Sequence, residues 1–200
     1  MVYLAIVSLI AGVLCAQFIF TPEISDLLIR LSDLVLYVLM ISVGISVGMN
    51  KVVLRKLKEY NLTVLLIPVG IIIGSAAGGG LAALVLQMPL STCVPIVSGL
   101  GWYSLSGVLV GDLIGAEAGT IAFLSNLLRE ILSFLLIPFI VRHFGPYTAI
   151  APAGATSEDT TLPMMIKYTS EDVVVISVMN GVICSACVPF LINLSYQLFR

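Results

Sequence analysis

The sequence predicts an all-α integral membrane protein with about seven membrane segments, at least one of which is a discontinuous or re-entrant helix. Of its 200 residues, 60% are hydrophobic and only 10% are charged, whereas about 25% of the residues in an ordinary soluble domain are charged. A helix that crosses the hydrocarbon core needs about 20 apolar residues, and runs of about that length fill the chain. We therefore expect one membrane domain, residues 1–200, and no soluble domain.

Seven apolar runs define the expected segments. Their approximate bounds are 3–20, 34–49, 62–86, 93–111, 120–141, 148–167 and 173–198. No Lys or Arg precedes Arg30, so the first run lacks the basic start of a secretory signal, and we expect it to be retained as a helix.

Positive charges predict the orientation of these segments. The only dense basic cluster is Lys51, Arg55, Lys56 and Lys58, and such clusters favour the cytoplasmic side. Alternation at every segment then predicts a cytoplasmic amino terminus, a cytoplasmic link at Asp112 and Glu117, external Arg142 and His143, cytoplasmic Lys167 and a periplasmic or extracellular carboxy terminus. The net charge of −2 and the single basic cluster indicate no nucleic-acid partner.

Small residues predict close helix packing. Glycines recur every fourth residue at Gly44 and Gly48 and in two longer sets, which are Gly70, Gly74 and Gly78, and Gly107, Gly111, Gly115 and Gly119. This spacing puts each set on one helical face, where helices in lipid approach closely. The four cysteines lie in apolar runs and are expected to pack as small hydrophobic residues. For Cys184 and Cys187, spaced C-x-x-C, the alternative is a metal or redox site.

Two segments are poor candidates for continuous helices. Residues 148–167 contain Pro152, Gly154 and Pro163 around a polar run at 156–161, which favours a broken or re-entrant helix. Residues 99–107, with three glycines and two serines, are a candidate second break. Irregular backbone at membrane depth occurs where it is buried in protein or lines a cavity, and transporters bind substrates and ions there.

The segment 120–141 carries one polar stripe. Its members are Ser125, Asn126, Arg129, Glu130 and Ser133, which project within an arc of about 140° at 100° per residue. Charged residues at this depth face the bundle interior or water. Arg129 and Glu130 form either an ion pair that locks helices together or part of a functional site. Neighbouring helix positions point in different directions, which favours different partners for the two side chains.

Asp159, beside Glu158, is a second intramembrane acid, and two carboxylates in a dry cavity suit a cation or a proton. The alternative is that both residues cap a half-helix near the interface. An enzyme is not indicated, because a serine or cysteine nucleophile needs a base and the sole histidine, His143, is expected at a membrane edge. A phosphate-binding G-x-x-x-x-G-K loop is absent from the sequence, and no cofactor is expected.

Four stretches in order resemble the lysine exporter family of bacterial inner membranes. They are GLGWYSLSG at 99–107, FLSNLLRE at 123–130, LIP at 136–138 and GATSEDTTLP at 154–163. The resemblance implies export of L-lysine and toxic lysine analogues from the cytoplasm in exchange for protons, and it places the family's intramembrane acids at Glu130 and Asp159. Typical single-chain members carry about three further amino-terminal helices. This sequence therefore resembles their carboxy-terminal portion and is expected to form a homo-oligomer or to recruit a small three-helix partner, which would complete an inverted repeat.

The function expected from the sequence is that of a secondary exporter of lysine. The lysine ammonium would pair with Asp159 or Glu130, and the carboxylate would meet Arg129 or an exposed half-helix amino terminus. Trp102 and Tyr103 either line the pocket over the aliphatic stem or pack between helices. The other expected site residues are Asn126, Ser104, Ser106, Thr156, Glu158 and Thr160. Two alternatives stay open: a proton-coupled antiporter for inorganic cations, and a non-transporting assembly subunit of a two-chain exporter.

Overall fold

The computed structural model describes residues 2–21, scattered positions between 24 and 49, and residues 65–200. The expected segment 34–49 lies largely outside these residues, and the basic cluster at 51–58 lies wholly outside them. The chain divides into two compact units, Met1–Ile45 and Ser46–Arg200, and each is described by itself.

The first unit contains α1, which spans Val2–Phe18 and occupies the first expected segment. Its turns carry no acidic residue at the start and no basic residue at the end, as suits a helix in hydrocarbon. The helix ends where the N–H groups of Ile19 and Phe20 both donate to the Cys15 carbonyl.

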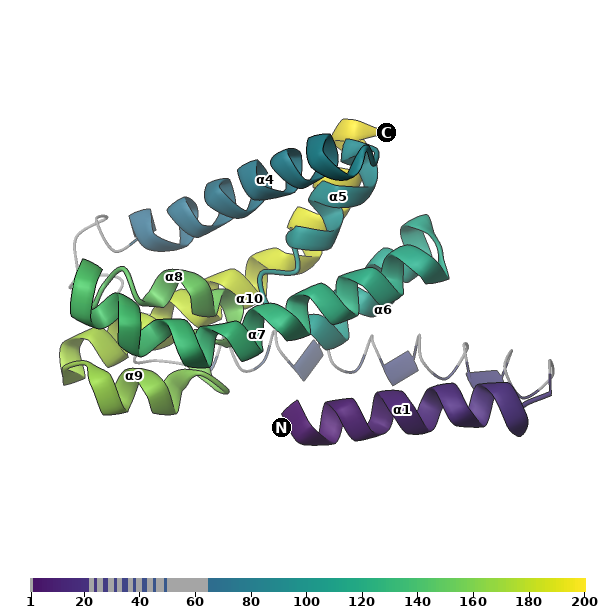
Figure 1. Cartoon of the computed structure of the whole chain (residues 1–200), viewed down its shortest axis with the longest axis horizontal. Helices are drawn as coiled ribbons and strands as arrows, with labels where there is room; N and C mark the ends of the chain where they lie inside the picture. The colour runs from purple at the N-terminus through teal and green to yellow at the C-terminus, as the bar shows by residue number, and fades with distance from the viewer. Residues whose placement is uncertain are drawn as a thin grey trace. The chain divides into compact units, whose positions relative to one another are not determined.

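Three long helices form the frame of the second unit. They are α4 at Leu66–Leu86, α7 at Ala116–Phe144 and α10 at Glu171–Phe199, and all three are long and apolar enough to cross a membrane. Figure 1 shows α4 and α10 beginning at the end of this unit where α7 finishes. All regular secondary structure among the described residues is helical, so the all-α class is confirmed there. The count of seven membrane segments remains a prediction.

A first broken segment follows α4. Helix α5 spans Leu90–Val97 and α6 spans Tyr103–Ile114. Both helices meet the middle of α7 at the break: the side chain of Asn126 donates to the Ile96 carbonyl over 2.9 Å and accepts the Gly101 N–H over 2.8 Å. Since α5 starts beside the end of α4 and only Gly115 separates α6 from α7, this segment enters and leaves at one end. We call residues 90–114 the first hairpin.

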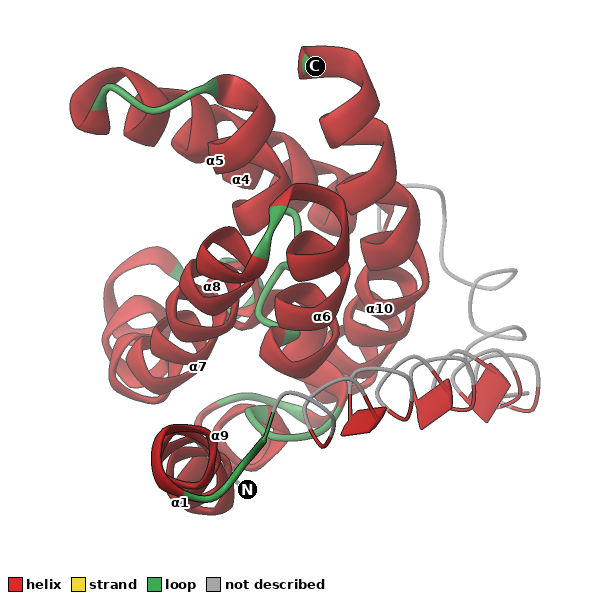
Figure 2. Ribbon diagram, turned by 90° about the vertical axis from the view of Figure 1, so that its right-hand side faces the viewer, coloured by secondary structure: helices red, strands yellow, loops and turns green. Residues whose placement is uncertain are grey.

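A second broken segment follows α7 and enters from the other end (Figure 1). Figure 2 shows its parts α8 and α9 as short helices. It consists of α8 at Ile150–Ala153, the 3₁₀ helix η2 at Gly154–Glu158, and α9 at Leu162–Tyr168, which leads back to the start of α10. The break predicted at 148–167 is therefore present. We call residues 150–168 the second hairpin.

The tips of the two hairpins touch through their backbones. The Ala155 N–H donates to the Leu100 carbonyl over 2.9 Å. A Cβ at Gly154 would collide with the same carbonyl oxygen, and Gly154 has φ +60°, a left-handed conformation that favours glycine. Leu100, only 1% exposed, also has a positive φ of 50°. The contact therefore depends on backbone conformation at both tips.

The hairpins correct the predicted orientation of two connections. Leu66 and Ile67, at the start of α4, line one cavity together with Tyr147 and Thr148, which follow α7. The beginning of α4 and the end of α7 thus lie at the same end, here called the cavity end. The predicted orientation assumed that the chain changes sides of the membrane at every segment. It therefore put Arg142 and His143 on the side opposite the start of α4, and it put the link at 112–117 on the same side as the start of α4. Both placements are wrong, because each broken segment turns back instead of crossing.

The two glycine sets differ in their surroundings. A Cβ at Gly119 would lie 2.6 to 2.9 Å from backbone atoms of Gly107 and Gly111, so the predicted close packing is confirmed between α6 and α7. By contrast, a Cβ at Gly70, Gly74 or Gly78 would have no described atom within 4 Å. This α4 set therefore does not serve packing against the part of the chain that the structure describes.

Candidate functional site

The polar stripe of α7 lies between the two hairpin tips. Asn126, Glu130 and Ser133 are buried, Arg129 is half-buried and Ser125 is exposed. The Asn126 side chain forms hydrogen bonds to Ile96 and Gly101 at the break in the first hairpin. Over residues 126–133, the polar side chains of α7 therefore lie mainly on its buried face.

Arg129 binds the second hairpin and α4. Its Nε donates to the Pro152 carbonyl over 3.1 Å, its Nη2 to the Ala151 carbonyl over 3.2 Å, and its Nη1 to the Ser75 hydroxyl over 3.0 Å. These carbonyls lie near the end of α8, where helical carbonyls lack internal partners and where the helix dipole favours a cation. Arg129 and Glu130 therefore have different partners, as their positions on the helix predicted.

Glu130 is a fully buried acid in the middle of α7. It is 1% exposed, and neither carboxylate oxygen has a hydrogen-bond partner among the residues described. The Thr160 side chain lies beside it, and Asp159 lies within electrostatic range. The Thr160 hydroxyl is itself buried without a hydrogen bond of acceptable geometry. Glu130 and Thr160 therefore place two adjacent buried polar groups at the hairpin tips.

Tyr103 joins this group from the first hairpin. It is half-buried, lies within electrostatic range of Glu130 and Asp159, and packs edge-on against the Phe123 ring with centroids 5.3 Å apart. Asp159 is exposed, and its carboxylate accepts the Thr160 N–H. The structure thus brings together four residues expected from the sequence, which we call the acid site: Tyr103, Glu130, Asp159 and Thr160.

Glu158 is engaged elsewhere, although it precedes Asp159 directly. Its Oε1 accepts the Ser185 hydroxyl of α10 over 2.6 Å. A Cβ at Gly181 would lie 2.5 Å from the backbone nitrogen of Glu158, so a glycine there allows η2 to lie against α10. The neighbouring Ser157 hydroxyl donates to the Ser177 carbonyl, and Asn180 donates to the Gly154 carbonyl. Glu158 therefore helps to hold η2 on α10.

The remaining expected residues have local roles or exposed positions. Thr156 is buried and donates to the Ala153 carbonyl over 2.9 Å. Ser106 is buried, with its hydroxyl 3.3 Å from the Tyr103 carbonyl. Trp102 is half-buried and Ser104 is exposed. None of these four is placed at the acid site by a described contact.

Ser75 and Ser185 were missed by sequence reasoning. Ser75 lies within the α4 glycine set, where small residues suggested packing, and Ser185 lies between Cys184 and Cys187 in the last segment. The sequence feature that could have identified either serine is a hydroxyl group on an apolar helix. This feature is not informative, because such a hydroxyl commonly donates a hydrogen bond to a carbonyl of its own helix.

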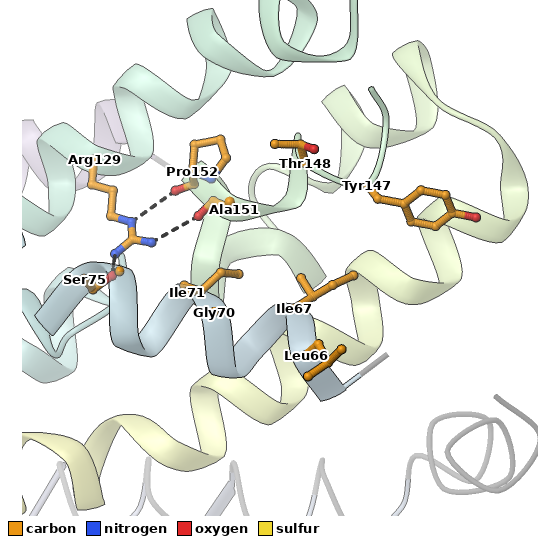
Figure 3. Close-up of a pocket in the computed structure, with 11 residues that line it drawn as sticks. Leu66, Ile67, Gly70, Ile71, Ser75, Arg129, Tyr147, Thr148, Ala151 and Pro152 are labelled. Carbon is orange, nitrogen blue, oxygen red and sulfur yellow. Dashed lines mark hydrogen bonds between the residues drawn. The ribbon is translucent and has the colours of Figure 1, made fainter. Parts of the chain in front are cut away.

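A cavity of about 570 Å³ lies between α4, α7 and α8. Figure 3 shows Arg129 and Ser75 at one end of it, with Leu66, Ile67 and Tyr147 at the other. Gly70 and Gly74 also line it. The cavity therefore leads from the cavity end of the unit to the Arg129 guanidinium.

Comparisons with known proteins agree on one family. A family model described as "Lysine exporter LysO" matches residues 6–196. The lysine exporter LysO of Escherichia coli K12 is 35% identical over 161 residues, which are 80% of this chain and 53% of that protein. This chain thus spans about half the length of that relative. A putative lysine exporter of Haemophilus influenzae is 35% identical over 189 residues, which are 94% of this chain and 92% of that protein. No solved structure matches.

Proposed function

Because the chain belongs to the lysine exporter family, we propose that it carries L-lysine out of the cytoplasm, across the bacterial inner membrane, in exchange for protons. The observation that carries this proposal is the Glu130 carboxylate, which is buried at the hairpin tips without a hydrogen-bond partner among the described residues. A charged side chain in the middle of a membrane costs at least about 2.5 to 3.5 kcal/mol. A side chain held at that cost is expected to serve the transported species.

The acid site suits two alternative cations. The side-chain ammonium of lysine and a proton both neutralise a carboxylate, and at a buried carboxylate such as Glu130 each binds more strongly than in water. Binding of one removes the charge that attracts the other. Competition for Glu130 and Asp159 therefore couples outward movement of lysine to inward movement of protons.

Tyr103 and Thr160 complete the binding of the ammonium end. The Thr160 hydroxyl accepts one ammonium N–H beside the Glu130 carboxylate, and the half-buried Tyr103 ring faces the methylene stem or the ammonium. Toxic lysine analogues that keep this end are expected to be carried as well.

We further propose an inverted-repeat mechanism of alternating access. The second unit contains the same order of elements twice: a long helix, a half-helix, a break and a second half-helix. The first copy is α4 with the first hairpin, and the second copy is α7 with the second hairpin. The two hairpins enter from opposite ends, and such paired breaks hold substrate and ion sites in secondary transporters. Movement of one hairpin tip against the other would expose the acid site to each side in turn.

The test is exchange in liposomes that contain the purified full chain. Loaded lysine should leave when a proton gradient is imposed, and Glu130→Gln should abolish this flux while Glu117→Gln, an exposed acid in the first turn of the same helix, leaves it unchanged. Full lysine flux through Glu130→Gln would contradict the proposal.

A proton-coupled antiporter for inorganic cations is the second candidate function. The observation that favours it is the same unpartnered carboxylate, because a bare carboxylate can neutralise Na⁺ or K⁺ as well as an ammonium. Proton-driven flux of Na⁺ or K⁺ without lysine flux would establish this alternative. If neither cation nor lysine moves until a second chain is added, the assembly-subunit alternative is supported.

A further inference from the structure

The cavity beside Arg129 lies apart from the acid site and has a polar inner end. Its walls are largely apolar or glycine, and its inner end is formed by Arg129 and Ser75 (Figure 3). From Leu66 to Ser75 the α4 helix rises by about 13 Å, close to half of a hydrocarbon core of about 30 Å. The guanidinium therefore lies about 13 Å along α4 from its first described turn, at the inner end of the cavity.

The Arg129 guanidinium has N–H groups at the inner end of the cavity that are not used in the hydrogen bonds described above. A guanidinium carries five N–H donors, and three of them are used by Ser75, Ala151 and Pro152. Within the described structure the two remaining donors have no protein acceptor. A planar cation with paired donors matches the two oxygens of a carboxylate.

The α4 glycines keep this cavity open. Gly70 and Gly74 line the cavity, and a Cβ at either position would have no described atom within 4 Å. Gly78 has the same open surroundings but does not line the cavity. It therefore provides a control one helical turn away.

The basic residues indicate which side the cavity faces. Arg142 lies in the last turn of α7 and Lys167 in the last turn of α9, and both turns are at the cavity end (Figure 1). Among the described residues of this unit, the opposite end holds only Arg200. An excess of Lys and Arg marks the cytoplasmic side, so the cavity end is cytoplasmic.

We infer that the cavity is the cytoplasmic entrance site for the exported molecule, and that Arg129 binds the carboxylate of an amino acid there. This inference rests on the proposed function for the identity of the substrate. The carboxylate meets Arg129 at the inner end of the cavity, and the acid-site residues do not line this cavity. The class of molecule recognised is a carboxylate with an ammonium at the far end of a flexible stem.

The experiment places single cysteines in a background from which Cys15, Cys93, Cys184 and Cys187 have been removed. Gly74→Cys is compared with Gly78→Cys, using an impermeant thiol reagent applied to inside-out or right-side-out vesicles. Gly74→Cys should react only from the cytoplasmic side. Lysine at ten times its Kd should slow that reaction about tenfold, because about one tenth of the sites then stay free, and Gly78→Cys should show no such protection.

Two ligands test recognition of the carboxylate without altering Arg129, which also holds α8. 6-Aminohexanoate keeps the carboxylate and the distal ammonium and should protect Gly74→Cys. 1,5-Diaminopentane lacks the carboxylate and should not. Equal protection by both would overturn the role of Arg129, and reaction only from the external side would overturn the assigned direction.

Failure of this inference is distinguishable from failure of the proposed function. Normal lysine flux in liposomes without protection of Gly74→Cys would show that the cavity is not on the route, while export itself stands. Protection by 6-aminohexanoate without any lysine flux would support the carboxylate site and contradict lysine export by this chain alone.

Discussion

Replacing Glu130 by glutamine keeps the shape of the side chain and removes its charge, so it separates a structural from a functional role. If Glu130 only packed between helices, export should survive the change. On the exporter mechanism, a neutral amide can neither hold a proton nor neutralise the lysine ammonium. We therefore expect Glu130→Gln to reach the membrane at normal levels with lysine flux below about one tenth of the wild type, a loss of more than about 1.4 kcal/mol in transition-state stabilisation.

The expected effect on stability has the opposite sign. An unpaired charge at this depth costs at least about 2.5 to 3.5 kcal/mol, whereas an unsatisfied buried amide costs about 1 to 3 kcal/mol. Since Glu130 is 1% exposed and lacks a described hydrogen-bond partner, the variant should be equally stable within about 0.5 kcal/mol or more stable by up to about 2.5 kcal/mol. For a chain of this size, each kcal/mol raises Tm by about 2 to 4 °C.

Thermal unfolding in detergent and lysine flux in liposomes are measured on the same preparations. Lysine at ten times its Kd should stabilise the wild type by about 1.4 kcal/mol, and this gain should vanish in Glu130→Gln but not in the exposed control Glu117→Gln. Wild-type flux together with an unchanged lysine-induced shift in Glu130→Gln would refute the reasoning and leave Glu130 a packing residue. A variant that unfolds at a much lower temperature would refute the stability calculation.

Three further predictions concern packing, the first break and the hairpins. Gly119→Val should lower stability by about 1 to 3 kcal/mol, because a Cβ there meets backbone atoms at 2.6 to 2.9 Å that cannot rotate away; Gly78→Val, with no described neighbour, should leave Tm unchanged. Asn126→Ala should cost about 1 to 3 kcal/mol, since the buried Gly101 N–H loses its acceptor, and Asn126→Leu should not restore the lost stability. Tyr147→Cys and Gly115→Cys should react with an impermeant thiol reagent from opposite sides of the membrane, because they lie at opposite ends of α7; reaction of both from one side would contradict the arrangement of the hairpins.

The two breaks were predictable from the sequence, but the path of the chain through them was not. Prolines and glycines at 152–163 and 99–107 signal irregular backbone wherever the segment runs. A broken helix that crosses and a hairpin that returns have the same composition and length. What distinguishes them is a set of long-range contacts, such as those from Asn126 to Ile96 and Gly101, and periodicity within one segment contains no information about them.

The acid site was predictable only in part, because the sequence of one helix indicates which of its residues are buried but not which residues of other helices they contact. Helical geometry indicated that Arg129 and Glu130 have different partners, and the cost of burying charge pointed to Glu130 and Asp159. The sequence could not pair Arg129 with Ser75, which comes from another helix. It also assigned Gly70 and Gly74 to packing, because an interhelical contact and the wall of a cavity both require a missing side chain.

The cavity also changes where the membrane voltage acts. Water in an open cavity carries the electrical potential of the solution outside it, so the potential difference falls across the remaining part of the protein. If α4 begins at the membrane surface, a cavity that reaches about 13 Å along it leaves little more than half of the hydrocarbon thickness to carry the voltage, and the electric field at the hairpin tips is nearly doubled. Each elementary charge that crosses a membrane gains or loses about 2.3 kcal/mol per 100 mV. On the proposed alternating-access mechanism this energy is exchanged in the step at the hairpin tips, so the rate of that step should respond most strongly to membrane voltage.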